Sequence, residues 1–374
     1  MKSYGEPMNK SEPLATGDVD KIRQTSMYSS IPEEIRAEFE RFGSYNGVKT
    51  AIHLPNGREA NIFFVEPLRR SQKSNFDLYL RFTVTWLRFV SRIASPSCAQ
   101  SLNIYILLTD LKKSIPASTK EPIDHIHSNT AFTTSCSSKN DIFIYRREEW
   151  LKVLFHESFH CLGLDFSAEP AEESNRRIVT AFPAVNPGTD IRLYESYCET
   201  WAEIMNIMFC LFTTKTGKIL PFSTRRFSAV LKKEQRFSIQ QSNKLLKRAG
   251  YRYKDLFSRP PPNKDFYREN TNAFSYYVIK SVLLSHIDEF VNWCQSNYAR
   301  NEIHQILQFP KELNSIRNSG MNGTIEVGDR VGNYCELVER LAINDRYLSA
   351  VKNSKPNASK TMRMTSIDPL WISR

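Results

Sequence analysis

The chain has 374 residues, of which 41% are hydrophobic and 24% are charged, and its formal net charge is +11 at pH 7. This composition can bury one large hydrophobic core or two modest ones. The longest strongly apolar stretch, residues 204–212, is too short to cross a bilayer, and the first residues contain no apolar signal region. The seven cysteines are an odd number without paired spacing, so we expect no disulfide framework and an intracellular, cytoplasmic protein.

The first part of the chain predicts a polar arm followed by alternating strands and helices. Residues 1–30 are polar and predict a flexible segment, and Ile35 and Phe39 mark a short amphipathic helix that Gly43 can end. We therefore treat residues 1–44 as an N-terminal arm. The later elements, in chain order, are a strand at 61–65, a helix over 74–93, and strands at 103–108 and 141–145.

The feature with the most chemical content is the sequence His-Glu-Ser-Phe-His at 156–160. Apolar residues at helical spacing through this segment predict a helix, which Gly163 can end. Positions four apart share a helix face, so His156 and His160 can present ring nitrogens to one metal ion. Glu157 would lie beside the open coordination position, where a carboxylate can take a proton from water. The alternative, two core histidines beside a solvated glutamate, leaves the polar face unexplained.

A second predicted helix, over 194–203, offers a third ligand. Its glutamates lie four residues apart, at Glu195, Glu199 and Glu203, and form one acidic stripe, with no Lys or Arg between Arg192 and Lys215. Like charges at this spacing are mildly destabilising, so a buried cation would explain the stripe. A solvated helix face is the alternative.

Together, the two helices resemble the gluzincin branch of the zincin metallopeptidases. The resemblance rests on the HExxH motif and on the downstream Glu-Thr-Trp-Ala-Glu unit that begins at Glu199. It implies that Glu199 is the third zinc ligand, that Ala202 allows close helix packing, and that Glu203 hydrogen-bonds a ligating histidine. Glu195 also has a glutamate four residues later, although Cys198 precedes that glutamate, so Glu195 remains an alternative ligand.

The same resemblance implies residues that would contact a substrate. Gluzincins carry an Asn-Ala-aromatic segment on an edge strand, and Asn129, Ala131 and Phe132 look similar with one inserted residue. An edge strand has unpaired backbone groups to which an extended peptide can add. A tyrosine or histidine of the C-terminal subdomain donates to the oxyanion in this family, which implies Tyr276 or Tyr277 here.

The metzincin branch is the rival interpretation of the motif. It requires a glycine where Gly163 stands, and a further ligand where this chain has Phe166. Asp165 lies one residue early, and no convincing Met-turn follows. Under this alternative Asp165 would replace Glu199 as the third ligand. Segments 145–153 and 269–277 also look similar to zincin-like proteins of large cytoplasmic DNA viruses, which would place the protein in a virion or in infected-cell cytoplasm.

The C-terminal part predicts a helical subdomain over 213–350 and a polar tail over 351–374. Within it, residues 223–259 hold eleven Lys or Arg and two acids, with aromatic residues between them. Such a surface can bind nucleic acid or an acidic partner, and a solvated cationic helix face is the alternative.

The sequence therefore predicts an α+β, zincin-like domain over 45–212, with a small mixed sheet, the HExxH helix and the glutamate helix. A mostly helical subdomain would form the far wall of its cleft. The implied function is hydrolysis of peptide bonds with one Zn²⁺ ion and Glu157 as general base. Two alternatives remain: a catalytically silent, zinc-stabilised structural or virion protein, and a nucleic-acid-binding protein that uses 223–259.

Overall fold

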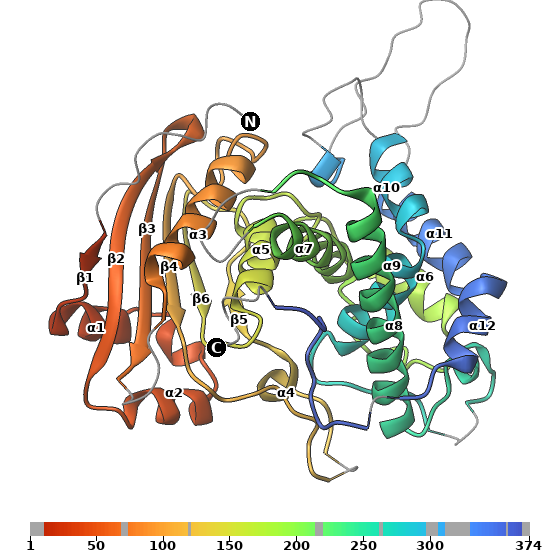
Figure 1. The fold of residues 1–374 in the computed structure, drawn as a ribbon. Coiled ribbons are helices and arrows are strands. Elements are labelled where there is room, and N and C mark those ends of the chain that lie inside the picture. Colours follow the sequence, from red (N-terminus) through yellow and green to blue (C-terminus); the bar gives the residue numbers. More distant parts are fainter. Residues whose placement is uncertain are drawn as a thin grey trace, which may run out of the picture.

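The computed structural model describes residues 11–68, 74–118, 121–213, 220–261, 265–296, 306–310, 330–356 and 358–368. In this part of the chain a sheet stands on one side of the molecule and a group of helices on the other (Figure 1). Helices α5 (Trp150–Cys161) and α7 (Leu193–Phe212) lie between them. The fold is α+β with a mixed sheet, as the sequence predicted.

The sheet has six strands in the order β1-β2-β3-β4-β6-β5. Their bounds are β1 (Glu12–Pro13), β2 (Tyr45–Leu54), β3 (Arg58–Pro67), β4 (Ser101–Leu107), β5 (Ala131–Thr133) and β6 (Lys139–Ile144). β3, β4 and β6 run parallel, and the other pairings are antiparallel. Parallel neighbours need a crossover, which α3 (Phe76–Val90) supplies between β3 and β4. The strands predicted at 61–65, 103–108 and 141–145 and the helix predicted over 74–93 are confirmed.

A tight turn joins β2 to β3. Asn56 and Gly57 have positive φ angles of 65° and 72°. Asn-Gly adopts this conformation readily, and it matches the twist of a hairpin. The turn therefore fixes the register in which β2 pairs with β3.

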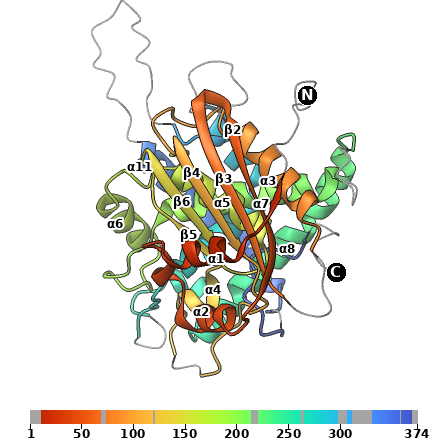
Figure 2. The same cartoon turned by 90° about the vertical axis from the view of Figure 1, so that its left-hand side faces the viewer.

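The two faces of the sheet are covered by different helices. Because side chains alternate along a strand, residues such as Phe64 and Ile142 pack into the larger core, which α3 and α5 also enter. Their neighbours Val65 and Phe143 belong to a smaller cluster with α1 (Thr16–Arg23) and α2 (Glu33–Glu40), which lie over the other face (Figure 2).

The packing of α1 against the sheet corrects the prediction that residues 1–30 form a flexible arm. Val19 and Ile22 of α1, and Tyr28 and Ile31 after it, are buried against the sheet. The prediction was wrong for residues 11–30 because few apolar side chains suffice to hold so short a helix on a large apolar face. Residues 1–10 lie outside the described residues.

Most of the remaining elements form the helical half of the molecule. They are α6 (Glu172–Ala181), α8 (Thr224–Arg248), the π-helix η4 (Phe274–Ile279), α9 (Lys280–Ser285), α10 (Ile287–Ser296), α11 (Arg330–Ala342) and α12 (Asp345–Asn353), with a short 3-10 helix at Tyr253–Phe257. Outside this group, α4 (His125–Ser128) leads into β5, and short 3-10 helices lie at Tyr28–Ser30, after α1, and at Pro55–Gly57, in the turn between β2 and β3. α8 contacts α7, α9 and η4, and side chains of the sheet and of these helices share the larger core. Within the described ranges, no helix is both long and apolar enough to cross a bilayer.

A disulfide joins Cys98 to Cys136, with their Cα atoms 4.9 Å apart. The expectation of no disulfide was wrong, because the two cysteines meet only once the sheet has formed. Disulfides persist in oxidising compartments and are rare in the cytosol. The cysteine argument for an intracellular protein is therefore removed.

The predicted polar tail is also corrected. α12 extends to Asn353, and residues 360–368 run from there back towards the sheet side of the molecule, in dark blue in Figure 1. Met362, Met364 and Thr365 are buried. The part of the tail that is described therefore belongs to the interior.

Candidate metal centre

Helix α5 carries the HExxH motif between the larger core and α7. Its Leu154, Phe155 and Phe159 are fully buried in that core. His156, Glu157 and His160 are only 6%, 7% and 8% exposed. The polar face of α5 is therefore enclosed by protein rather than by solvent.

The end of α5 has the geometry predicted for Gly163. Gly163 has a φ of 64°, its N–H donates to the carbonyl of His160 (3.1 Å), and the N–H of Leu164 donates to the carbonyl of Phe159 (2.8 Å). This pair of bonds is the Schellman motif, in which a glycine reverses the chain. The reversal brings Asp165 back to His160.

Three side-chain atoms converge at the centre of the site. Nε2 of His156 and Nε2 of His160 are 3.1 Å apart, and Oε2 of Glu195 lies 3.0 Å from the first and 3.2 Å from the second. The ligand atoms of a tetrahedral zinc ion, bound at about 2.0–2.1 Å, lie about 3.3 Å from one another. The triangle thus has the size that a zinc ion requires of three ligands.

Each histidine has a carboxylate behind it. Nδ1 of His156 lies 3.0 Å from Oε2 of Glu199, and Nδ1 of His160 is bonded to Oδ2 of Asp165. Metal-ligating histidines almost always have such a partner, which fixes the ring orientation and leaves Nε2 for the metal. The structure thus offers a group of possible ligands, His156, His160 and Glu195, with both rings already oriented.

This geometry corrects the expected roles on α7. Glu199 approaches only the far side of His156, and its other oxygen is bonded to Lys152, so the carboxylate at the triangle is that of Glu195. Among the described histidines, none contacts Glu203, whose Oε2 lies 3.6 Å from Nζ of Lys280. The carboxylate at the triangle and the carboxylate behind His156 therefore lie one helical turn nearer the start of α7 than the residues predicted for these positions.

The metzincin alternative is not supported by these positions either. Asp165 meets Nδ1 of His160 rather than the triangle of ligand atoms. Asp165, His160 and Cys198 form a second group that could hold a metal ion. In this group the sulfur of Cys198 lies 3.6 Å from Oδ2 of Asp165. That group shares a histidine with the first triangle, so Asp165 serves here as the partner that orients His160.

Glu157 lines a small cavity of about 30 Å³ beside the triangle. Asn129, just before β5, and Ala131, at its start, line the same cavity, and β5 is an edge strand as expected. Contact of these residues with a substrate stays a prediction. Phe132 points the other way: it stacks on Phe143 in the smaller cluster, with ring centroids 5.5 Å apart. Its predicted place in the site is wrong, because neighbouring side chains of a strand alternate between faces.

The two candidate tyrosines have different surroundings. Tyr276 lines the cavity, and its ring centroid lies 5.9 Å from that of His156. The hydroxyl of Tyr277 instead donates to the carbonyl of Met362 (2.5 Å). Of the two predicted donors, only Tyr276 is in the site.

Two residues of the site were not predicted. Asn272 donates from Nδ2 to Oε1 of Glu195 (3.2 Å), which holds the other oxygen of that carboxylate towards the histidines. Lys152 is buried and bonded to Glu199. Lys152 lies one turn before His156 on the same helix, a spacing that could have indicated it, whereas Asn272 has no comparable signal.

The charged groups of the site and their burial shift the pKa values of both histidines and of Glu157. Burial lowers the pKa of His156, but the carboxylates of Glu195 and Glu199 outweigh it and raise that pKa to about 9. The pKa of His160 is raised well above its usual value, since neighbouring anionic groups outweigh burial. Burial raises the pKa of Glu157. The carboxylates therefore create a site that attracts positive charge.

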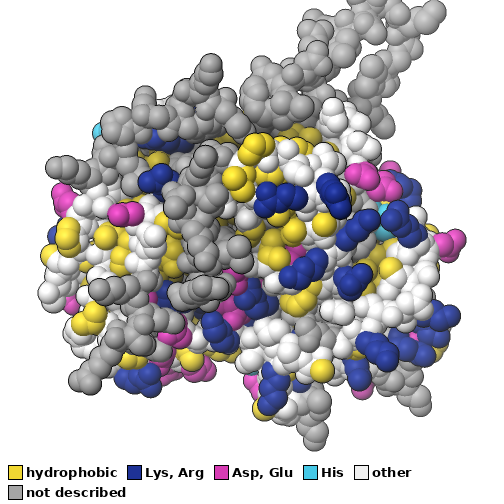
Figure 3. Space-filling view, in the orientation of Figure 1, with side chains coloured by type: hydrophobic (Ala, Val, Ile, Leu, Met, Phe, Trp, Pro, Cys, Tyr) yellow, Lys and Arg dark blue, Asp and Glu magenta, His cyan; other side chains and the backbone are white. Residues whose placement is uncertain are grey.

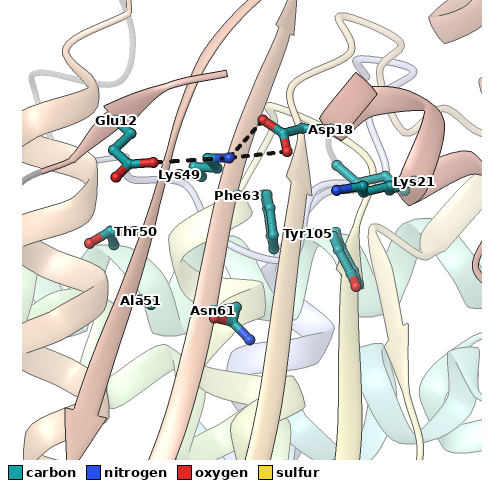
Figure 4. A pocket seen from close by; sticks show the side chains of 10 residues that line it. Glu12, Asp18, Lys21, Lys49, Thr50, Ala51, Asn61, Phe63 and Tyr105 are labelled. Carbon is teal, nitrogen blue, oxygen red and sulfur yellow. Dashed lines mark hydrogen bonds and ion pairs between the residues drawn. The ribbon is translucent and has the colours of Figure 1, made fainter. Parts of the chain in front are cut away.

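A larger hollow, of about 560 Å³, lies far from this chemistry on the outer face of the sheet (Figure 4). Lys49 bridges Glu12 and Asp18 at its rim, and Phe63 and Tyr105 stack along its floor. No histidine or cysteine is among the residues that line it. The hollow therefore offers no ligand set comparable to the metal centre.

Comparisons with known proteins add no relative. Profiles of protein families, curated proteins and solved structures were each searched with this chain, and none of the three searches found a match.

Proposed function

We propose that the protein is a zinc-dependent peptidase of the gluzincin type. The observation that carries the proposal is the triangle of His156, His160 and Glu195 with a carboxylate behind each histidine. Two histidines and a glutamate leave a fourth position open, which is the arrangement of catalytic rather than structural zinc sites. In this proposal the Glu-x-x-small-Glu unit begins at Glu195, with Cys198 in the small position and Glu199 as the orienting acid.

The chain's own residues then have distinct tasks. Zinc bound at the triangle would supply a water of lowered pKa and an electrophile for the scissile carbonyl. Glu157, on the cavity side of the centre, accepts a proton and returns it to the leaving amine. Tyr276, which also lines the cavity, offers its hydroxyl to the carbonyl oxygen that becomes negatively charged. Asn272 keeps Glu195 oriented.

The substrate in this proposal is an extended peptide. β5 is the edge strand nearest the cavity, and Asn129 and Ala131 line the cavity at its start. An edge strand offers free backbone groups, to which a peptide adds as a further strand independently of its side chains.

Zinc analysis of three variants tests the proposal. We expect near-stoichiometric zinc in the wild type and its loss in Glu195→Ala. Glu199→Gln, which removes the charge behind His156, should bind zinc about 10–100-fold more weakly. Glu157→Gln should keep zinc but lose hydrolysis of unfolded casein by about 100-fold or more. A Glu195→Ala protein that retained zinc as well as Glu199→Gln does would contradict the ligand assignment.

One observation favours a second function. On α8 the exposed charged side chains are all cationic: Arg225, Arg226, Lys232, Lys233, Arg236 and Lys247. Glu234, the acid of this helix, is buried. Figure 3 shows Lys and Arg side chains gathered over this side of the molecule. Such a face fits a nucleic acid or another anionic polymer.

A further inference from the structure

Residues 360–368, which we call the strap, lie between residues 113–115 and Glu149 on one side and side chains of α8, η4 and α9 on the other. We call the space that the strap fills the cleft. On the sheet side, the N–H of Ile115 donates to the carbonyl of Lys360 (2.8 Å) and the N–H of Met362 donates to the carbonyl of Lys113 (3.1 Å). Ser114 and Thr361 form an antiparallel bridge. The strap begins as a short added strand.

Buried carboxylates bind the next backbone N–H groups of the strap. Oε1 of Glu149 accepts from Met364 (2.9 Å) and Thr365 (2.7 Å), and Oε2 of Glu234 accepts from Ser366 (2.9 Å). These carboxylates come from opposite walls, because Glu149 precedes α5 and Glu234 lies on α8.

Side chains of the helical half bind the carbonyl groups of the strap. Tyr277 donates to the carbonyl of Met362 (2.5 Å), and Nζ of Lys280 donates to that of Met364 (2.7 Å). Gln241 and Lys244 donate to the carbonyl of Thr361. The cleft thus recognises the backbone of an extended segment along its length, which is how proteins hold peptides without reading every side chain.

The strap reaches the metal centre through Met364. The side chain of Met364 lines the cavity that His156 and Glu157 also line. The sulfur of Met364 lies 3.6 Å from Nζ of Lys152. The cavity left is about 30 Å³. One water needs about 10–15 Å³ by the same measure, so there is room for water beside Glu157 but not for a peptide.

The strap also contacts the start of the motif helix. Glu149 caps α5 in a left-handed conformation, with a φ of 61°, which is unfavourable for a glutamate. Its carboxylate is bonded to Lys113 as well as to the strap. The strap therefore helps to hold the first turn of α5, two turns before His160.

We propose that the strap is an intramolecular occupant of the substrate cleft, and that it keeps the peptidase latent until it is displaced. The proposal rests on the proposed function, since it concerns access to the same metal centre. None of the six strands includes the strap. Its departure therefore leaves the described sheet intact and exposes backbone-binding groups on both walls of the cleft. A peptide could then enter the cavity that Met364 now lines and reach Glu157 and Ala131 of β5, which line the same cavity.

Zinc extraction by the chelator 1,10-phenanthroline tests the proposal without requiring a known substrate. Met362→Glu places a charge at a strap side chain that is 1% exposed, whereas Lys360→Glu changes an exposed side chain at the start of the strap. We expect the zinc-loaded Met362→Glu protein to lose zinc about tenfold faster than the wild type, because local opening controls access. Lys360→Glu should match the wild type.

A second and less disruptive variant tests the proposal in case the Met362→Glu protein does not fold. Tyr277→Phe removes only the hydroxyl that binds the carbonyl of Met362, and should speed zinc loss about threefold. A synthetic peptide with the sequence of residues 360–368 should restore slow release in both variants, and a scrambled peptide should not. Hydrolysis of unfolded casein should rise in the same order.

The outcomes separate the two proposals. Equal extraction rates from wild type, Met362→Glu and Tyr277→Phe, all loaded with stoichiometric zinc, would overturn the latent strap and leave the metal centre standing. Absence of zinc from the wild type would overturn the proposed function, and the strap proposal with it.

Discussion

At the scale of single residues, a metal ion that binds at the candidate centre would have to displace protons from its histidines. Nearby carboxylates raise the pKa of His156 to about 9 in the metal-free protein. Zinc binds neutral imidazole, so below that pH binding must release protons. We expect the zinc affinity of the stripped protein to rise at least about tenfold per pH unit from about pH 6 to about pH 8, and to rise less steeply above about pH 9, where His156 is already neutral.

Calorimetry measures the number of protons that are released when zinc binds. Zinc titrated into the metal-free protein in two buffers of different ionisation enthalpy should reveal at least about one proton released per ion at neutral pH. Glu199→Gln, which removes a carboxylate that raises the pKa of His156 and is expected still to bind zinc, should release fewer. An affinity that stayed flat over this pH range would contradict the raised pKa of His156.

The acidic stripe of α7 shows where residue patterns stop being informative. Glu195 faces the two histidines, Glu199 binds Lys152, and Glu203 lies near Lys280. The sequence suggested a buried metal ion or a solvated helix face for the stripe, and it did not predict the buried lysines beside Glu199 and Glu203, which are distant in the chain. Three glutamates at equal spacing are equivalent on a helix, so only the register of α7 against α5 selects the one that meets the triangle.

At the scale of elements, the disulfide anchors the edge of the sheet. Cys98 lies before β4 and Cys136 lies between β5 and β6, and the bond spans 38 residues. Closing such a loop restricts the unfolded chain and typically adds about 2–4 kcal/mol to the free energy of unfolding. We expect Cys136→Ser to lower the free energy of unfolding by this amount, measured by urea denaturation.

The matched control is Cys210→Ser, which changes a free and partly exposed cysteine. It should leave the urea midpoint nearly unchanged. Reductant should destabilise the wild type and the control but not Cys136→Ser. A wild-type midpoint that did not respond to reductant would show that the bond contributes no stability.

The strands that could be predicted are those buried on both faces. β3, β4 and β6 contain runs of β-branched and aromatic residues, which are typical of central strands. β2 was not predicted, since Tyr45–Leu54 mixes polar residues with a glycine. Gly47 is needed there because a Cβ atom would lie 2.0 Å from the carbonyl oxygen of Phe64. Such a close approach depends on the neighbouring strand and leaves no local pattern.

At the scale of the whole molecule, the metal centre draws on both halves. The edge of the sheet contributes Asn129 and Ala131, η4 contributes Tyr276, and the strap contributes Met364. The motif helix and the glutamate helix were predictable because ligands at i and i+4 mark a helix face. The position of the strap could not be predicted, because it is a short extended segment without periodicity and is held mainly through its backbone.

The distribution of charge over the molecule gives the last prediction. The net charge is +11, and α8 holds eight Lys or Arg against the buried Glu234. If α8 binds nucleic acid, affinity for a single-stranded oligonucleotide should fall steeply with salt, because each phosphate contact releases a counterion. Lys232→Glu/Lys233→Glu should weaken binding and reduce the slope of log affinity against log salt by about 1–2.

A second double variant with the same change in net charge tests whether binding depends on the surface of α8 or only on the total charge of the protein. Lys21→Glu/Lys139→Glu makes the same change in net charge on exposed residues of α1 and β6, away from α8. It should reduce affinity far less and leave the slope nearly unchanged. Equal losses in the two double variants would mean that the oligonucleotide responds only to total charge. Affinity that did not depend on salt would remove the phosphate argument, and the cations of α8 would then be a solvated helix face.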